Sequence, residues 1–264
     1  MSQPKQKALF YSTDRQSLYV GRLERMLTQS NVSSTLLLSI DKQFDLIDQS
    51  SGTVHSSKSL LVPAGSNVTI DTRNAKVAVC FLNDLGTDLS KMITRMDESF
   101  VVNGKSRVYS NISHESEIIK TAENIWEKRP SIEDVAEEVN SWVEFFNTKF
   151  VDVPDPRVAK AISIIKENCS ENLSVIDVAN KVNLSVPRLT QLFKRVTGTP
   201  IRRFRLWHRI FLTAIKTGEG LSLTDASISS GFSDYAQFSR VYRELCGGSP
   251  AAARNNTEIR VMAS

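Results

Sequence analysis

The sequence predicts an α+β chain in two parts, a β-rich N-terminal domain and an all-α C-terminal domain. Three observations predict this class: short β-rich runs up to about residue 113, helical periodicity after that, and a helical unit that occurs twice in the last third. The 264 residues leave one large domain or two unequal ones. Two prolines, Pro154 and Pro156, disfavour helix in the residues before them and mark the best boundary. We therefore predict a domain over residues 1–146, a linker over 147–156, a second domain over 157–254 and a tail over 255–264.

The N-terminal part carries short β-rich runs with turn residues between them. The clearest runs are Thr35–Ile40, Phe44–Asp48, Leu60–Val62, Val68–Asp71 and Val77–Leu82. Turn residues such as Pro63-Ala64-Gly65 and Asn83-Asp84 separate or follow them. Runs of this length and spacing predict a small antiparallel sandwich or barrel.

Apolar residues then recur at steps of three and four between Glu115 and Phe146, with a break at Pro130. This spacing predicts two amphipathic helices. Two interpretations are open: the helices cover the β-domain, or part of the apolar stripe pairs with the same stripe of a second chain. In the second interpretation the dimerisation residues are Val135, Val139, Trp142, Val143 and Phe146.

A unit of helix, tight turn and helix occurs twice in the C-terminal part. Residues 173–179 match residues 221–227, 48 positions later, and similar turns and second helices follow both. Ser-x-x-Asp predicts a cap on each first helix, Asn183 and Gly231 suit the turns, and Ser185 and Ser233 are expected to cap the second helices. The residues between the units, 201–217, predict a helix of about 25 Å. Two helix-turn-helix units on such a rod could enter successive major grooves, about 34 Å apart.

The positive charge lies in the second part of the chain. The whole sequence has a net charge of +4, with 17 basic and 20 acidic residues before Asp155 and 16 basic and 9 acidic residues from there on. Between Arg188 and Arg209 seven residues are basic and none is acidic. A charge run is often only a solvated face, but a field of one sign also attracts polyanions such as nucleic acid.

Residues 231–250 read Gly-Phe-Ser-Asp-Tyr-Ala-Gln-Phe-Ser-Arg-Val-Tyr-Arg-Glu-Leu-Cys-Gly-Gly-Ser-Pro. With this motif, residues from about 157 to 254 resemble the DNA-binding domain of the AraC/XylS family of bacterial transcription regulators. The resemblance implies two helix-turn-helix units on a linking helix, and a cupin-like N-terminal barrel that senses a ligand or mediates dimerisation. Three places depart from the family pattern: Asn183-Leu184, Pro187 and Ala253.

The exposed faces of the two second helices are the expected DNA contacts. Gln191 is expected to pair with adenine and Arg240 with guanine, although Arg240 could instead bond to Asp234 or Glu244. The expected base contacts are Arg188, Gln191, Tyr235, Gln237 and Arg240, and the expected phosphate contacts are Ser185, Lys194, Arg195, Arg202, Arg203, Arg209, Ser233 and Arg243. For each of these the alternative is an exposed polar residue without a role.

Other chemistry is not expected. The three histidines are far apart, the three cysteines form no Cys-x-x-Cys pair, and no nucleophile or phosphate-loop motif is found, which argues against an enzyme, a metal site and a cofactor. The longest apolar run has six residues, Val77–Leu82, and the polar N-terminus resembles no signal peptide, so we expect a cytoplasmic protein without membrane contact.

The sequence therefore predicts a sequence-specific regulator of transcription. Its expected partners are double-stranded promoter DNA, a second copy of the chain, RNA polymerase, and a small-molecule or protein effector of the N-terminal domain. Two alternatives are a β-barrel enzyme with an appended helical interaction domain, and an adaptor that a protein partner regulates.

Overall fold

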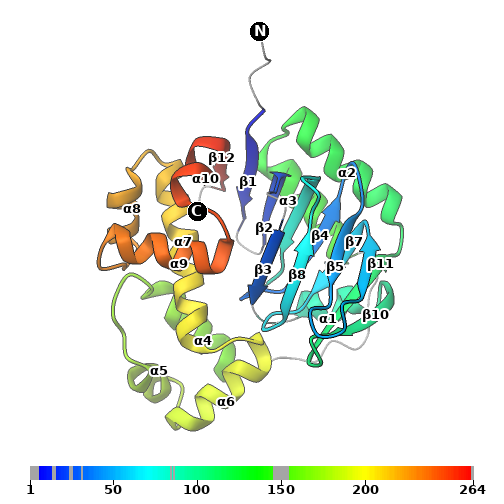
Figure 1. The fold of residues 1–264 in the computed structure, drawn as a ribbon. Coiled ribbons are helices and arrows are strands. Elements are labelled where there is room, and N and C mark those ends of the chain that lie inside the picture. Colours follow the sequence, from blue (N-terminus) through cyan, green and yellow to red (C-terminus); the bar gives the residue numbers. More distant parts are fainter. Residues whose placement is uncertain are drawn as a thin grey trace.

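The computed structural model describes residues 6–13, 16–23, 26–30, 32–83, 85, 87–144 and 155–262. In the described residues a β-rich domain with three helices lies beside a helical domain, and a long helix of the latter, α7 (Ile201–Gly218), runs along the border between them (Figure 1). The elements of the β-rich domain are β1 (Ala8–Ser12), β2 (Ser17–Arg22), β3 (Met26–Ser30), β4 (Thr35–Ser39), β5 (Phe44–Ile47), β6 (Val54–Ser57), β7 (Ser59–Val62), β8 (Asn67–Asp71), β9 (Lys76–Phe81), α1 (Thr87–Ile93), β10 (Met96–Val102), β11 (Ser106–Ile112), α2 (Glu115–Lys128) and α3 (Ile132–Glu144).

Two sheets pack face to face in this domain. The larger has the order β10-β11-β7-β4-β9-β2-β1-β12 and the smaller β3-β8-β5-β6. All five residues of β4 are buried, because the strand is covered on both faces. Leu37 packs with residues of the small sheet such as Phe44, whereas Leu36 and Leu38 pack on the opposite face with α2 and α3. The domain thus has three layers, with the helices on one side of the larger sheet.

Helices α2 and α3 cover the β-domain, which is the first of the two interpretations above. Arg129 ends α2 in a left-handed conformation (φ 50°), and Pro130 separates it from α3. The residues expected at a dimer interface that the structure describes, Val135, Val139, Trp142 and Val143, are 1–3% exposed and belong to the domain's own core. The prediction that these four residues contact a second chain is therefore wrong. The apolar stripe of α3 packs instead against the apolar surface of its own domain. The fifth, Phe146, lies outside the described residues.

The helical domain has two cores that share one helix. Its elements are α4 (Pro156–Glu167), α5 (Val175–Lys181), α6 (Val186–Thr197), α7 (Ile201–Gly218), α8 (Leu223–Ser229), α9 (Tyr235–Cys246), α10 (Pro250–Asn256) and β12 (Thr257–Val261). Ile201 and Phe204 of α7 pack with α4, α5 and α6, and Ile210 of α7 packs with α9. Helix α7, with 18 residues, is therefore a rod that carries one helical unit at each end.

The end of the chain returns to the β-rich domain, where the sequence suggested only a tail. Strand β12 pairs in parallel with β1, from Ala8 opposite Thr257 to Ser12 opposite Val261, and forms an edge of the larger sheet (Figure 1). Arg260 donates hydrogen bonds to the carbonyl oxygens of Arg129 (2.9 Å) and Pro130 (2.6 Å), between α2 and α3. The two domains are thus joined by a shared sheet as well as by the chain between α3 and α4. No helix in the described part of the chain is long and apolar enough to cross a membrane.

Candidate nucleic-acid interface

The two helix-turn-helix units are built by short-range interactions. In the first, Ser174 and Asp177 form a reciprocal cap on α5, and Asn183 makes the turn with φ 54°. The hydrogen bonds from Ser174 hold the pKa of Asp177 below its ordinary value, so the cap stays charged at neutral pH. The hydroxyl of Ser185 then caps α6 by accepting from the backbone N–H of Arg188 (3.4 Å), and Pro187 stands in the first turn, where its missing N–H costs no helical hydrogen bond.

The second unit repeats this plan with one difference. Ser222 caps α8, and Gly231 makes the turn with φ 98°. A side chain at Gly231 would lie 2.8 Å from the Nε atom of Arg209, so the close approach as well as the turn requires glycine. The N-cap of α9 is Asp234 and not Ser233, as the sequence suggested, because the carboxylate accepts from the backbone N–H of Gln237 at 2.7 Å. That bond holds the pKa of Asp234 below its ordinary value.

The exposed face of α6 carries a paired arginine and glutamine. Arg188, Gln191, Lys194 and Arg195 are exposed, and Leu189, Leu192 and Phe193 on the other side are buried in the first core. The Nη1 atom of Arg188 donates to Oε1 of Gln191 at 2.9 Å. The predicted base contacts of this unit therefore lie side by side on one exposed surface.

On α9 the exposed face carries Arg240 and Arg243. Gln237, at the N-terminal end, accepts from the backbone N–H of Ser233 (2.8 Å) and from its hydroxyl (3.2 Å). Tyr235 is half-buried and packs on Phe238, with ring centroids 6.0 Å apart. The ring of Tyr235 thus belongs partly to the second core.

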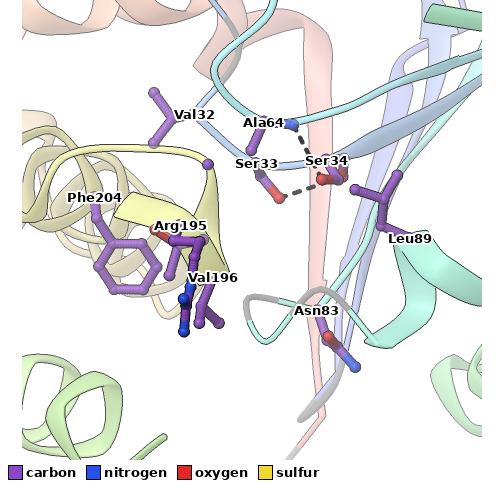
Figure 2. Close-up of a pocket in the computed structure, with 11 residues that line it drawn as sticks. Val32, Ser33, Ser34, Ala64, Asn83, Leu89, Arg195, Val196 and Phe204 are labelled. Atoms are coloured by element: carbon purple, nitrogen blue, oxygen red, sulfur yellow. Dashed lines mark hydrogen bonds between the residues drawn. The ribbon is translucent and has the colours of Figure 1, made fainter. Parts of the chain in front are cut away.

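Not all of the expected phosphate contacts are available. Arg202 is exposed, whereas Arg203 is half-buried and forms an ion pair with Glu244 of α9 (3.7 Å), which joins α7 to the second unit. Arg195 lines a small pocket against the β-rich domain, and Figure 2 shows its side chain beside Val196 and Phe204, across from Ser33 and Ser34. The described faces of α6 and α9 therefore leave Arg188, Lys194, Arg240 and Arg243 as exposed cations away from that border.

The prediction that Arg209 contacts a DNA phosphate is wrong. It is only 7% exposed, and it donates to the backbone carbonyl oxygens of Cys169 (2.8 Å) and Glu171 (3.2 Å) and to Oδ1 of Asn172 (3.4 Å). The guanidinium thus fixes the loop between α4 and α5 to α7. A basic residue in a charge run cannot be told from a buried one by sequence alone.

We expect Arg209→Ala to lower the free energy of unfolding by about 3 kcal/mol, because buried carbonyl oxygens lose a charged donor. Arg202→Ala, on the same helix but exposed, is the matched control and should change it by about 0.5 kcal/mol or less. Thermal or denaturant unfolding of both variants measures the difference. If Arg209→Ala left the stability unchanged and made DNA binding less dependent on salt, Arg209 would instead be a phosphate contact.

A larger cavity lies between the two domains. Its volume is about 390 Å³, and its wall includes Phe10, Tyr19 and Phe81 from the β-rich domain and Trp207, Phe211 and Tyr242 from the helical domain. Phe81 and Trp207 pack with ring centroids 5.4 Å apart, and Phe10 and Phe211 do the same at 5.4 Å. Burial raises the pKa of Tyr19 to about 12, so this phenol is uncharged at neutral pH. An apolar ligand in the cavity would contact both domains at once.

The cavity residues of α7 were not predicted from the sequence. The signal that could have found them is the length of the apolar stripe on this helix: Trp207 and Phe211, three and seven residues after Phe204, continue the stripe of the first core along α7. A linking helix that met solvent along its middle would not need apolar residues there. In the described residues no group of three or more His, Cys, Asp or Glu side chains is placed to hold a metal ion.

The comparisons with known proteins agree with this geometry. Residues 178–256 match the helix-turn-helix domain family. The chain is 31% identical over 96 residues to the Msm operon regulatory protein of Streptococcus mutans, covering 36% of this chain and 34% of that protein. It is 30% identical over 125 residues to the arabinose operon regulatory protein of Escherichia coli, covering 45% and 41%. The chain thus aligns with well under half the length of these curated relatives, each of which is named as the regulatory protein of an operon.

Solved structures of ToxT from Vibrio cholerae resemble the chain over nearly its whole length. One has a TM-score of 0.60 at 13% identity and covers 92% of this chain and 98% of ToxT. Another, described as bound to an unsaturated fatty acid, has a TM-score of 0.58 at 13% identity and covers 92% and 96%. At this identity the likeness shows the fold alone, an α+β arrangement of a β-rich domain and a helical domain. The helical part of this chain is an AraC-type helix-turn-helix domain.

Proposed function

We propose that the chain is a regulator of transcription that binds promoter DNA through α6 and α9 in successive major grooves. One observation carries the proposal: a single rigid helix holds two helix-turn-helix units, and the second helix of each presents exposed basic and amide side chains. A rod of 18 residues spans roughly 27 Å, close to one turn of B-DNA once the side chains that reach the grooves are included. Catalysis has no part in the proposal.

Binding of the full chain to genomic DNA fragments across a salt series tests this function. Gln191→Ala and Arg240→Ala should each weaken binding to selected fragments by roughly tenfold or more and leave the non-specific background unchanged, because they remove contacts to base edges. Lys194→Ala, the matched control on α6, should weaken binding to all fragments alike and reduce the salt slope by about one.

Equal binding of all fragments by the full chain and by all three variants would contradict sequence-specific recognition. In that case the adaptor interpretation, in which a protein partner binds the N-terminal domain, would be favoured. Stoichiometric iron or zinc in the purified chain would favour the enzyme interpretation instead.

Three further parts of the proposal rest on the resemblance. We propose that the chain forms a homodimer, that it contacts RNA polymerase at the promoter, and that it lies in the cytoplasm. With Val135, Val139, Trp142 and Val143 buried, a dimer needs a contact surface other than that stripe.

The N-terminal domain is proposed to control DNA binding through the cavity between the domains. The cavity wall is mostly aromatic and aliphatic, and two arginines, Arg22 and Arg254, also line it. A small apolar acid suits such a wall, and the fatty acid in the ToxT structure is of this class. A ligand that touches both domains favours the arrangement in which those contacts exist, and so changes the availability of α6 and α9.

Thermal unfolding with oleic acid as the probe tests the cavity. At a free concentration 100 times the dissociation constant, bound oleic acid should stabilise the chain by about 2.7 kcal/mol. Ala214→Phe places a larger side chain in the cavity wall and should abolish that shift. Methyl oleate, which lacks the carboxylate, separates the charge contribution from the apolar one. An equal shift in Ala214→Phe would exclude this cavity as the site.

A further inference from the structure

We propose that α6 and α9 turn the NH₂ end of their glutamine toward the bases, so that each unit selects guanine rather than adenine at the position its glutamine faces. The inference rests on the proposed function and deepens it, because it names the base class that each unit recognises. It differs from the adenine expected for Gln191 from the sequence.

In the second unit the amide oxygen of Gln237 is occupied within the protein. It accepts from the backbone N–H of Ser233 at 2.8 Å, whereas the Ser233 hydroxyl, 3.2 Å away, has one proton and lies closer to Oδ2 of Asp234 (3.0 Å). A backbone N–H can only donate, so the partner atom must be Oε1, and the NH₂ group of Gln237 is the end left for DNA. In return, Asp234 accepts from the backbone N–H of Gln237 at 2.7 Å. The amide orientation is therefore part of the cap of α9.

In the first unit an arginine takes the place of that backbone donor. Nη1 of Arg188 donates to Oε1 of Gln191 at 2.9 Å. A guanidinium has five N–H donors and no acceptor, so the Gln191 oxygen is the accepting atom: one of its two lone pairs is engaged, the oxygen end of the amide faces Arg188, and the NH₂ end faces away from it. Two glutamines in different local settings thus present the same chemistry.

The acidic side chains near these faces already have partners. Helix α6 contains no acidic residue, Glu244 on α9 forms an ion pair with Arg203, and Asp234 at the start of α9 accepts from the backbone N–H of Gln237 (2.7 Å) and from the Ser233 hydroxyl (3.0 Å). Apart from hydroxyl groups, the faces offer the donors of Arg188, Gln191, Gln237 and Arg240. Guanine presents two acceptors, N7 and O6, in the major groove, whereas adenine needs one donor and one acceptor from the protein. A set in which donors face the bases therefore matches guanine.

Selection of binding sites from a random DNA library by the full chain tests the inference. Gln191→Ala identifies the position that this residue reads, as the one where base preference disappears. At that position the unmodified chain should prefer guanine over adenine by roughly tenfold. Arg188→Met frees the Gln191 oxygen, so the preference there should move toward adenine. Lys194→Met, which removes a charge from the same helix without touching the pair, should keep guanine and weaken all sites alike.

Gln237→Glu is the corresponding test of the second unit. A carboxylate can still accept from Ser233 and maintain the cap, but it has no donor, so guanine preference should disappear at the Gln237 position while the helical content stays unchanged. Failure to select any sequence would contradict the proposed function itself. A selected site with adenine opposite Gln191 in the unmodified chain, or with an unchanged preference in Arg188→Met and Gln237→Glu, would overturn this inference and leave the proposed function standing.

Discussion

Gly198→Ala is expected to lower the melting temperature by roughly 5 °C more than Gly52→Ala, because only the first change forces the two domains apart. A side chain on Gly198 would lie 2.5 Å from the backbone oxygen of Ala64, in the β-rich domain. The reverse contact is equally short: a side-chain carbon added to Gly65 would lie 2.3 Å from the backbone oxygen of Gly198. A backbone contact cannot relax by rotating a side chain, so the helical domain itself must move.

Gly52 is a closely matched control. Both glycines have φ 73°, and each donates its N–H to the carbonyl oxygen four residues earlier, Gly198 to Lys194 and Gly52 to Asp48. Alanine therefore suffers the same left-handed strain at both positions. No atom lies within 4 Å of a side chain added to Gly52. Calorimetry of both variants isolates the interdomain contact, and equal losses would show that Gly198 matters only for its own conformation.

A chain that ends at Asn256 is expected to lose about 3 kcal/mol of stability and to unfold in two transitions instead of one. It lacks β12, which pairs with β1 along five residues and which also supplies Ile259 to the cavity wall. It also lacks Arg260, whose guanidinium lies 5.6 Å from the ring of Tyr11 and forms an ion pair with Glu258 (2.8 Å). Without these contacts the helical domain contacts the β-rich domain mainly at Gly198 and along α7.

Scanning calorimetry and limited proteolysis measure this change. A chain that lacks only residues 263–264 keeps β12 and should behave as the full chain does. The single change Gly218→Ala is a second approach, because its added carbon would lie 2.9 Å from Cγ2 of Ile259 and push β12 away from α7. One unchanged transition in both the truncated chain and Gly218→Ala would contradict a structural role for β12.

Much of the helical domain could be predicted from the sequence, because its signals are local. The Ser174–Asp177 cap, the turn at Gly231 and the apolar spacing of Leu189 and Phe193 each act within a few residues. Five strands of the β-rich domain and the break at Pro130 were predicted for the same reason. Local patterns also predicted which residues of α6 face outward, and the structure leaves Arg188 and Gln191 exposed.

Other features depend on residues far apart in the sequence. The apolar stripe of α3 predicts burial but not the surface that covers it, which is why Val135 and Val139 suggested a dimer and instead belong to the core of their own domain. In the same way, Arg209 and Lys194 are both basic residues in one charge run, and only packing shows that Arg209 is buried against carbonyl oxygens.

The sequence by itself determined the α+β class, the two helix-turn-helix units and the face of each unit that meets solvent, because capping, turn formation and periodicity act over short stretches of chain. Only the tertiary structure decided that β12 joins β1, that Gly65 meets Gly198 and that Phe81 and Trp207 enclose a cavity between the domains. Each of these contacts joins residues more than 100 positions apart, and no local preference of either partner specifies the other.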